Sequence, residues 1–458
     1  MDIYLTNTLT RKKEKFEPIN NKKVNLFVCG PTVYDYSHLG HAKTYTQFDF
    51  LVRFLRYFGF DVFYLQNITD IDDKILARAK ESNIEWKDLT RKFEKLYLED
   101  MKKLNNTSVT KYARATDYIE QIVKQVKTLL KKGYAYKIDD GIYFEISKFP
   151  DYGKLSGRIK LEQEDSVSRI DENKQKLGWN DFCLWKFSKP DEPSWKTDMG
   201  NGRPGWHIED TAITETFFGP QYDVHGGAVD LIIPHHEAEI AQMEATSGKK
   251  PLVRYWLHTA FLMVDGRKMS KSLGNFYTIS DVVEKGFDPL ALRYLFLGAH
   301  YRDTLNFTWE SLKAAQNGLE RLRNQINIFK AETGRTILSN EKENKIETFR
   351  SKFFEALSDD LNTSKALAIL WEVMKSNIPS TDKYDLAIVF DEVLGLELGL
   401  PDYGLAETAE IKSLREKRDE LRKNGKYLEA DEIRKKVIEL GFDIVDTIEG
   451  SITKPVKK

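Results

Sequence analysis

The chain has 458 residues, of which 41% are hydrophobic and 31% are charged. This length exceeds one compact domain and predicts about three globular units, and the composition excludes a disordered, collagenous or membrane protein. The 70 Lys and Arg residues nearly cancel the 71 Asp and Glu residues. Any nucleic-acid contact must therefore come from local basic patches and not from a global positive field.

The first residues contain no apolar targeting core, and no apolar run approaches the ~18 residues that a membrane span requires. We therefore expect a cytoplasmic protein with no membrane contact. Only two cysteines occur, Cys29 and Cys183, which excludes a disulfide framework and fits a reducing compartment. Cys183 lies in an apolar run and is expected to be a packed core thiol.

The first part of the chain predicts one half of a parallel sheet. An apolar run ends at Cys29 and is followed by Gly-Pro, as is typical of a buried strand that enters a loop. Hydrophobic residues then recur at helical spacing from Phe48 to Phe58, Gly59 stops that helix, and a strand-like run follows at 60–69. Strand, helix and strand form a βαβ unit, whose ligands bind at the carboxyl ends of the strands.

Between 136 and 204, short strand-like pieces alternate with loops rich in Gly, Pro and Trp, which indicates an insertion. The α/β pattern then resumes with a strand and a helix from near Pro234 to Gly248, and a mostly helical pattern follows. The predicted fold is a Rossmann-type α/β parallel-sheet domain split by an insertion, followed by an all-α helical bundle and a small C-terminal helical hairpin. The predicted boundaries are 1–135 and 205–262 for the sheet domain, 136–204 for the insertion, 263–310 for a loop region, 311–400 for the bundle and 401–458 for the hairpin.

The segment His38-Leu39-Gly40-His41 lies where the first strand gives way to a helix. The free N–H groups at a helix N-terminus bind anions, and Gly40 lets a nucleotide approach the backbone closely. The imidazoles of His38 and His41 can donate hydrogen bonds to phosphate oxygens as charge builds up in a transition state. Taken alone, the segment fits a pair of surface histidines capping a helix equally well.

A second motif, Lys268-Met269-Ser270-Lys271-Ser272, lies more than two hundred residues downstream between Gly- and Ser-containing flanks. Two ammonium groups on a flexible loop can fold over a triphosphate and neutralise the departing pyrophosphate, although an exposed basic loop is the plain alternative. The two motifs at this separation resemble the signature pair of class I aminoacyl-tRNA synthetases, and the joint match is far more specific than either half.

Five further segments resemble the cysteinyl-tRNA synthetase family, and the resemblance extends from the first strand to the final hairpin. They are Cys29-Gly30, Asn67-Ile68-Thr69-Asp70-Ile71-Asp72-Asp73-Lys74, Pro204-Gly205-Trp206-His207-Ile208-Glu209, His225-Gly226-Gly227 and Pro234-His235-His236-Glu237-Ala238-Glu239. The resemblance implies a monomer that activates L-cysteine with ATP and Mg²⁺ and transfers it from cysteinyl-adenylate to the 3′-terminal adenosine of tRNA(Cys).

The resemblance also implies a zinc ion that binds the substrate thiolate, with Cys29, His235 and Glu239 as three of its four ligands. His235 and Glu239 are four residues apart and share a helix face, whereas His236 points roughly 100° away on a regular helix. Taken alone, that pair also fits a solvated helix face. Where the family usually has a second cysteine, this chain has Asp210, a harder ligand that can complete a tetrahedral site but should hold zinc less tightly.

Family positions assign the remaining site residues. The resemblance implies a cysteine pocket lined by Gly30, Thr69 and Trp206. It implies an ATP site formed by His38, Gly40, His41, Asp230, Lys268, Ser270, Lys271 and Ser272. It implies catalytic roles for His38, His41, Lys268 and Lys271.

The bundle and the C-terminal hairpin would hold the tRNA, with the anticodon end on the hairpin. The hairpin carries ten basic and six acidic residues between 411 and 436, a modest excess that also fits a solvated pair of amphipathic helices. Two alternatives remain open. One is a ligase that joins activated cysteine to an amino-sugar acceptor and needs no anticodon module, and the other is a non-catalytic tRNA-binding paralogue, which Asp210 makes worth stating.

Overall fold

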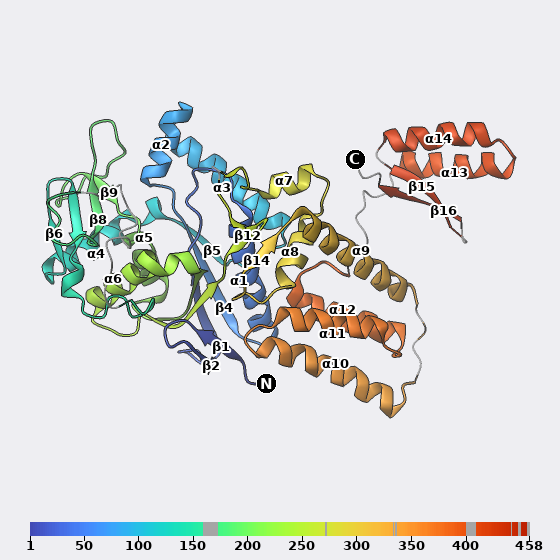
Figure 1. Ribbon diagram of the computed structural model, residues 1–458, viewed down its shortest axis with the longest axis horizontal. Coiled ribbons are helices and arrows are strands. Elements are labelled where there is room, and N and C mark those ends of the chain that lie inside the picture. Colours follow the sequence, from blue (N-terminus) through green and yellow to red (C-terminus); the bar gives the residue numbers. More distant parts are fainter. Residues whose placement is uncertain are drawn as a thin grey trace.

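A computed structural model describes residues 1–158, 173–270, 273–332, 334, 337–399, 409–440, 442–447 and 450–455. A sheet domain lies between an insertion and a helical bundle, and a small C-terminal unit stands apart from the bundle (Figure 1). Lys271 and Ser272 of the predicted ATP site lie outside the described residues, as does the start of the predicted hairpin at 401–408.

A five-stranded parallel sheet forms the centre of the sheet domain, in the order β11-β10-β3-β4-β5. Its strands are β3 (Lys23–Val28), β4 (Asp61–Ile68), β5 (Lys111–Arg114), β10 (Tyr222–Ala228) and β11 (Val253–Thr259). The chain leaves β3 toward β4 on one side and returns through β10 on the other, so the strand order reverses between β3 and β10. Doubly wound sheets bind ligands outside the carboxyl ends of the strands at such a point.

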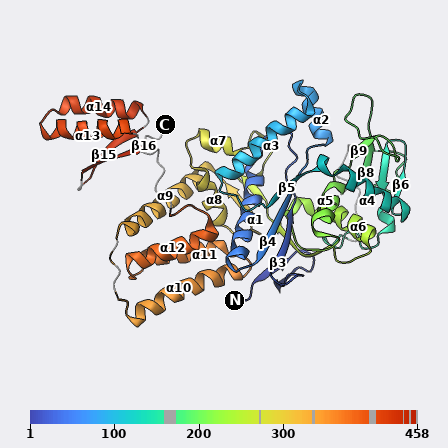
Figure 2. The ribbon, with the colours of Figure 1, turned by 180° about the vertical axis from the view of Figure 1, so that it is seen from behind.

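Helix α1 (Leu39–Tyr57) follows β3 and packs on the sheet against β4 and β10 (Figure 2). It ends where predicted, because Gly59 takes a left-handed backbone conformation with φ of 78°. The predicted βαβ unit is confirmed. The other helices of this part are α2 (Asp73–Ser82), α3 (Trp86–Lys103), α4 (Ile119–Lys131), α5 (Ile208–Phe218), α6 (Glu237–Ser247), α7 (Ile279–Glu284) and α8 (Pro289–Leu297).

The insertion contains an antiparallel sheet in the order β6-β7-β8-β9. Its strands are β6 (Ala135–Lys137), β7 (Gly141–Phe144), β8 (Phe182–Phe187) and β9 (Gly202–Pro204). Short strands elsewhere are β1 (Tyr4–Asn7), β2 (Lys12–Lys15), β12 (Leu262–Val264), β13 (Arg267–Lys268) and β14 (Leu305–Phe307). The parallel sheet interrupted by this insertion confirms the predicted fold class.

The helix predicted from near Pro234 begins only at Glu237 as a regular α-helix. The residues before it, Ile232–His236, form a π-helical turn in which Ile233 has an extended backbone with φ of −127° and ψ of 132°. Ideal helical spacing therefore does not govern where the side chain of His236 points.

The bundle consists of α9 (Trp309–Ala331), α10 (Asn340–Ser358), α11 (Thr363–Lys375) and α12 (Ser380–Leu394). The fully buried guanidinium of Arg293, on α8, joins this bundle to the sheet domain. It donates to the Leu394 carbonyl oxygen at the end of α12 (2.6 Å), to Asp49 Oδ2 in α1 (2.8 Å) and to Asn106 Oδ1 (2.9 Å). Because a buried charge is stable only when it is paired and hydrogen-bonded, these contacts fix the bundle against α1.

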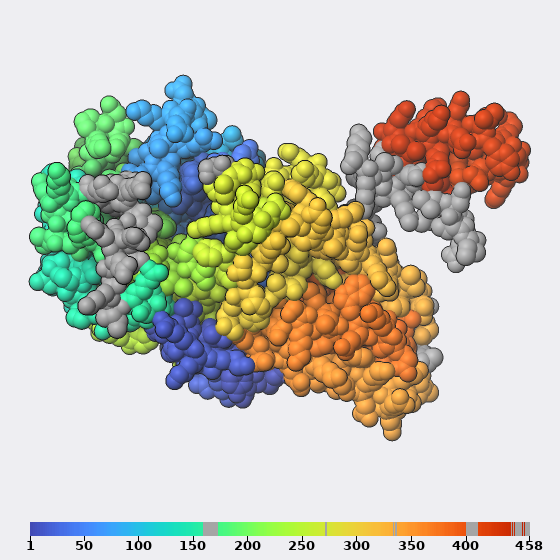
Figure 3. All heavy atoms as spheres, in the orientation of Figure 1, coloured from blue at the N-terminus to red at the C-terminus, as the bar shows by residue number. Residues whose placement is uncertain are grey.

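The C-terminal unit comprises α13 (Ala409–Lys423), α14 (Tyr427–Glu439), β15 (Phe442–Thr447) and β16 (Gly450–Pro455). The two helices of the predicted hairpin are present, with Gly425 between them at φ of 73°, but the β-hairpin after them was not predicted. Ile433, Val437 and Phe442 belong to a hydrophobic core of its own, and Figure 3 shows the unit protruding from the body of the molecule. No helix in the described part of the chain is both long and apolar enough to cross a membrane.

Candidate active site

The N-terminus of α1 faces a cavity of about 480 Å³, here called the reaction cavity. Nine predicted site residues line it outside the metal-ligand group: Gly30, His38, Gly40, His41, Thr69, Trp206, Asp230, Lys268 and Ser270. The structure therefore brings together residues from both motifs and from the predicted cysteine pocket.

Gly40 and the two histidines around it form a closely packed turn. Nδ1 of His38 accepts a hydrogen bond from the His41 backbone N–H (3.3 Å), and the two rings stack with centroids 3.8 Å apart. A Cβ on Gly40 would lie 2.8 Å from the His38 ring, so only glycine leaves that ring in place. Burial, and then the neighbouring His38, lower the pKa of His41, and its buried Nδ1 has no hydrogen-bond partner in the described structure. This neutral imidazole can offer a nitrogen to a ligand.

The segment that follows the second motif packs against the first motif. The backbone N–H of Leu39 donates to the carbonyl oxygen of Tyr277 (3.0 Å), and His38 pairs with Thr278 in an isolated β-bridge. The backbone N–H of Ser270 donates to Asn275 Oδ1 (2.8 Å), which helps to shape the loop. Two segments more than two hundred residues apart in sequence thus share one cavity wall.

Two of the four predicted zinc ligands, Cys29 and Asp210, line the reaction cavity, and the other two, His235 and Glu239, lie next to them. All four are buried, and one donor atom from each lies within 4.8 Å of the others. His235 Nε2 is 2.9 Å from Asp210 Oδ2 and 3.2 Å from Glu239 Oε1, which is 3.7 Å from Cys29 Sγ. Zinc bonds of 2.0–2.3 Å in a tetrahedron place the ligand atoms about 3.3–3.6 Å apart, so the group fits such an ion.

The chemistry of these donors also fits a cation. Burial, followed by the charges of Glu239 and Asp210, raises the pKa of the Cys29 thiol, and burial raises the pKa of Glu239. Glu239 Oε2 is buried and makes no hydrogen bond to any described residue. A divalent cation supplies the positive charge that allows a thiolate and two carboxylates to be ionised together in such a place.

A second group of buried donors overlaps the first and consists of Cys29, His225, His236 and Glu239. His236 Nε2 lies 3.2 Å from Cys29 Sγ, and His225 Nε2 lies 3.4 Å from it. The expectation that His236 points away from the site is wrong, because this residue belongs to the π-helical turn before α6. The sequence held a signal for both residues, since five of its eight histidines fall between 207 and 258.

Neighbouring side chains hold the first ligand group in position. Asn67 Nδ2 donates to Asp210 Oδ1 (2.6 Å), and the two Nδ1 atoms of His207 and His235 are 2.8 Å apart. The indole of Trp206 stacks on the His235 ring with centroids 4.3 Å apart and 15° between the planes. Such contacts fix ring orientation and tautomer, so that Nε2 of His235 faces the ligand group.

The predicted cysteine-pocket residues adjoin this group. A Cβ on Gly30 would lie 1.7 Å from the Asn67 carbonyl oxygen, so glycine is required where β3 and β4 end. Thr69 Oγ1 donates a short hydrogen bond to buried Glu209. Asp230 is exposed and lines the reaction cavity. Cys183 is buried in β8 and belongs to neither donor group.

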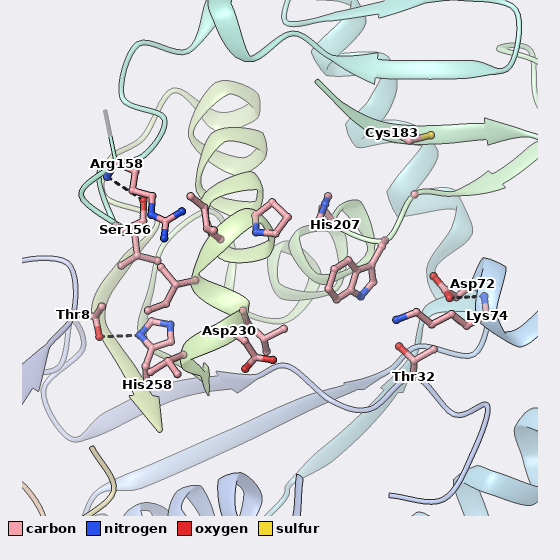
Figure 4. Close-up of a pocket in the computed structure, with 18 of the residues that line it drawn as sticks. Thr8, Thr32, Asp72, Lys74, Ser156, Arg158, Cys183, His207, Asp230 and His258 are labelled. Carbon is pink, nitrogen blue, oxygen red and sulfur yellow. Dashed lines mark hydrogen bonds between the residues drawn. The ribbon is translucent and has the colours of Figure 1, made fainter. Parts of the chain in front are cut away.

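Figure 4 shows a larger cavity of about 1250 Å³, here called the side cavity, which shares part of its lining with the reaction cavity. It lies between the sheet domain and the insertion, and its lining includes Thr8, Ser156, His207 and His258. Six residues line both cavities: Thr32, Lys74, Trp206, Asp230, Leu231 and Lys268. These six are called the neck.

A parallel sheet with one motif at the N-terminus of α1, and with Lys268 and Ser270 of the second motif lining the same cavity, defines the catalytic domain of a class I tRNA synthetase. Residues 15–317 match the family described as tRNA synthetases class I (C) catalytic domain, and residues 352–377 match the DALR domain. The cysteine–tRNA ligase of Thermococcus onnurineus is 44% identical over 100% of both chains. That of Methanococcus maripaludis strain C7 is 42% identical over 98% of both chains. The chain belongs to the cysteine–tRNA ligase family, which confirms the resemblance seen in the sequence.

Solved structures share the fold at low sequence identity. A methionyl-tRNA synthetase of Mycobacterium tuberculosis in complex with methionyl-adenylate is 15% identical, with a TM-score of 0.58 over 82% of this chain and 90% of that chain. A LeuRS of Agrobacterium radiobacter K84, in a ternary complex with tRNA and LeuAMS, is 11% identical, with a TM-score of 0.61 over 83% of this chain and 84% of that chain.

Proposed function

We propose that the protein is a cysteine–tRNA ligase, which uses ATP to join L-cysteine to tRNA(Cys) and releases AMP and diphosphate. The observation that carries this proposal is that Cys29 and Asp210, which form one group with His235 and Glu239, line the same cavity as described residues of both motifs. A sulfur-binding group at that place suits cysteine as the amino acid that is activated.

In the first step, a carboxylate oxygen of cysteine attacks the α-phosphorus of MgATP. The bond from that phosphorus to the diphosphate breaks, which leaves cysteinyl-adenylate and diphosphate. His38, His41 and the backbone N–H groups at the start of α1 donate hydrogen bonds to the phosphate oxygens, and Gly40 allows the nucleotide to approach. The second motif supplies charge to the departing diphosphate through Lys268 and Lys271, with Ser270 and Ser272 beside them.

The adenosine ribose would bind Asp230 in the lining of the reaction cavity. Gly30, Thr69 and Trp206 would enclose the cysteine, with the indole held by its stacking on His235. A zinc ion held by the four donors would bind the substrate sulfur as a thiolate, a form that the far less acidic hydroxyl of serine does not reach.

In the second step, a hydroxyl of the 3′-terminal adenosine attacks the carbonyl carbon of cysteinyl-adenylate. An ester bond forms, the bond from that carbon to the phosphate oxygen breaks, and AMP departs as the hydroxyl proton passes to phosphate or water. The bundle and the C-terminal unit would bind the tRNA. The full-length alignment with the Thermococcus relative includes this unit, which favours a tRNA acceptor over an amino sugar.

Two assays on the purified chain test the proposal. We expect cysteine-dependent exchange between ATP and pyrophosphate, little exchange with serine, and charging of tRNA(Cys). A variant that lacks 405–458 should keep the exchange and lose most of the charging, because the C-terminal unit has its own core and none of its described residues lines the reaction cavity. Absence of exchange with cysteine would refute the proposal, and exchange with esterification of an amino sugar only would favour the alternative ligase.

A further inference from the structure

Phe261 is an exposed aromatic side chain in the lining of the reaction cavity. Two other exposed aromatic side chains line this cavity. Trp206 stacks on the His235 ring, and Tyr36 packs edge-on against Phe93. Phe261 belongs to neither sequence motif and not to the predicted cysteine pocket, so its place in the lining has no assigned role. Its ring lies under a cation.

This cation is Lys268, the first lysine of the second motif. Its Nζ atom lies over the Phe261 ring, 5.3 Å from the centroid, within the ~6 Å at which an aromatic ring attracts an ammonium group. The pairing of β12 with β13 explains the contact, because Met263 lies opposite Lys268. Phe261 precedes Met263 by two residues and therefore lies on the same face of the strand, as a diagonal neighbour of Lys268. Lys268 forms no ion pair with the described residues, so its charge is available to a ligand.

The backbone on both sides of the Phe261 ring is held in place. The carbonyl oxygen of Phe261 accepts a hydrogen bond from the Leu305 N–H (3.1 Å), and Lys43 of α1 donates from Nζ to the Ala260 carbonyl oxygen (2.8 Å). Lys268, in contrast, is exposed and is one of the neck residues. A long side chain with several rotatable bonds thus rests on a ring whose position is fixed.

The ring restricts the lysine on the correct side of the cavity wall. A lysine side chain has many rotamers, and holding it in one of them costs conformational entropy. Because Phe261 and Lys268 line the same cavity, the ring keeps the ammonium group beside the space for the nucleotide. Part of the entropy cost is therefore met before a ligand enters.

We propose that Phe261 is a positioning residue for adenylation. Its ring holds the Lys268 ammonium group at the reaction cavity before ATP binds, so that the charge is already in place when diphosphate departs. The ring takes no part in binding cysteine. The inference rests on the proposed function, since it requires that Lys268 acts on the diphosphate.

The test uses full-length chains with Phe261→Leu, which removes the ring and keeps an apolar side chain, and Phe261→Tyr, which keeps the ring. Phe261→Leu is also combined with Lys268→Met and, as a matched control, with Arg267→Met. Arg267 is the exposed neighbour of Lys268 in β13 and lines neither cavity. Exchange between ATP and pyrophosphate gives the maximal rate and the KM for cysteine, and thermal melts check folding.

A second measurement reports the contact without catalysis. Lysine labelled with ¹³C at Cε gives an NMR signal for Lys268, which is assigned by its absence in Lys268→Met. The aromatic ring shifts this signal as long as the side chain lies over it. The signal should move to the position of a solvated lysine in Phe261→Leu and stay in place in Phe261→Tyr.

For Phe261→Leu we expect a maximal exchange rate lowered about 3- to 10-fold, or about 0.6–1.4 kcal/mol, the range for one cation–π contact. The KM for cysteine should stay within twofold of wild type, and Phe261→Tyr should recover most of the rate. In the Lys268→Met background, Phe261→Leu should cause less than a twofold further loss, whereas the full loss should persist in the Arg267→Met background.

Equal losses in the two backgrounds would overturn the inference, because the ring would then act without the lysine. Unchanged exchange in Phe261→Leu would also overturn it, as would faster exchange, which would show that the ring withholds the ammonium group from ATP. In these cases the wild type still activates cysteine, so the proposed function stands. A wild-type chain with the ring-shifted Lys268 signal but no exchange with cysteine would refute the proposed function, and the role of Phe261 in adenylation would fail with it.

Discussion

Replacing His235 by alanine tests which of the two buried donor groups holds the metal. His235 belongs only to the group with Asp210, and its neighbour His236 belongs only to the group with His225. The two residues are equally buried, at 1% and 0% exposure, so His236→Ala is a matched control. Four-ligand zinc sites bind with about 10–16 kcal/mol, so one ligand contributes about 3 kcal/mol, or roughly a hundredfold in the dissociation constant.

We expect His235→Ala to lose its zinc to a chelator that leaves the wild-type chain loaded, and His236→Ala to stay within tenfold of wild type. Zinc content by mass spectrometry, with competition against a chromophoric chelator, measures both, and thermal melts check that each variant is folded. Asp210→Cys should bind zinc more tightly than wild type, because thiolate is the softer ligand. Zinc lost from folded His236→Ala but retained by folded His235→Ala would refute this reasoning and assign the metal to the second group.

Three further changes probe other parts of the molecule. Gly40→Ala should slow cysteine-dependent pyrophosphate exchange about 100-fold with little change in melting temperature, because the new Cβ displaces the His38 ring; normal exchange would contradict the assignment. Arg293→Met should lower the free energy of unfolding by about 3–5 kcal/mol, because the charge of Asp49 stays buried without this partner. In denaturant melts, the double variant with Asp49→Asn should recover part of that loss. A further loss in the double variant would argue against an energetic coupling between Arg293 and Asp49. Burial lowers the pKa of Lys43 to about 8 from 10.5, so the unfolded chain binds more protons between these values. The free energy of unfolding of the wild type should therefore rise relative to that of Lys43→Met as pH rises from 8 to 10.5. If the two free energies change in parallel with pH, the pKa of Lys43 is not lowered in the folded chain.

Sequence patterns predicted the sheet domain well because its elements follow local rules. Gly-Pro after an apolar run marks the end of β3, and Gly59 stops α1 by adopting a left-handed conformation. The start of α6 was predicted too early, since the extended backbone of Ile233 has no clear signal in residue type. The hairpin β15–β16 escaped prediction because it buries few side chains, among them Phe442 and Ile444 against the C-terminal helices.

In the candidate site too, contacts set by local spacing could be predicted from the sequence, and contacts set by strand pairing could not. The spacing of His235 and Glu239, together with the family resemblance, was enough to predict that they face each other. The approach of His225 to Cys29 depends instead on the parallel pairing of β10 with β3, in which Gly226 lies opposite Val28. No local pattern in the sequence carries that register, because the two strands are separated by the whole insertion.

The contacts of Arg293 limit how freely the bundle can be exchanged between relatives. One guanidinium bonds α1, the loop carbonyls of Leu104 and Asn105, and the last turn of α12, so its partners come from three separate stretches of sequence. A chimaera joined between α8 and α9 would keep Arg293 but receive a foreign end of α12. A bundle taken from a relative should therefore fit only when its last helix places a backbone carbonyl where that of Leu394 lies, whatever the overall similarity of the two bundles.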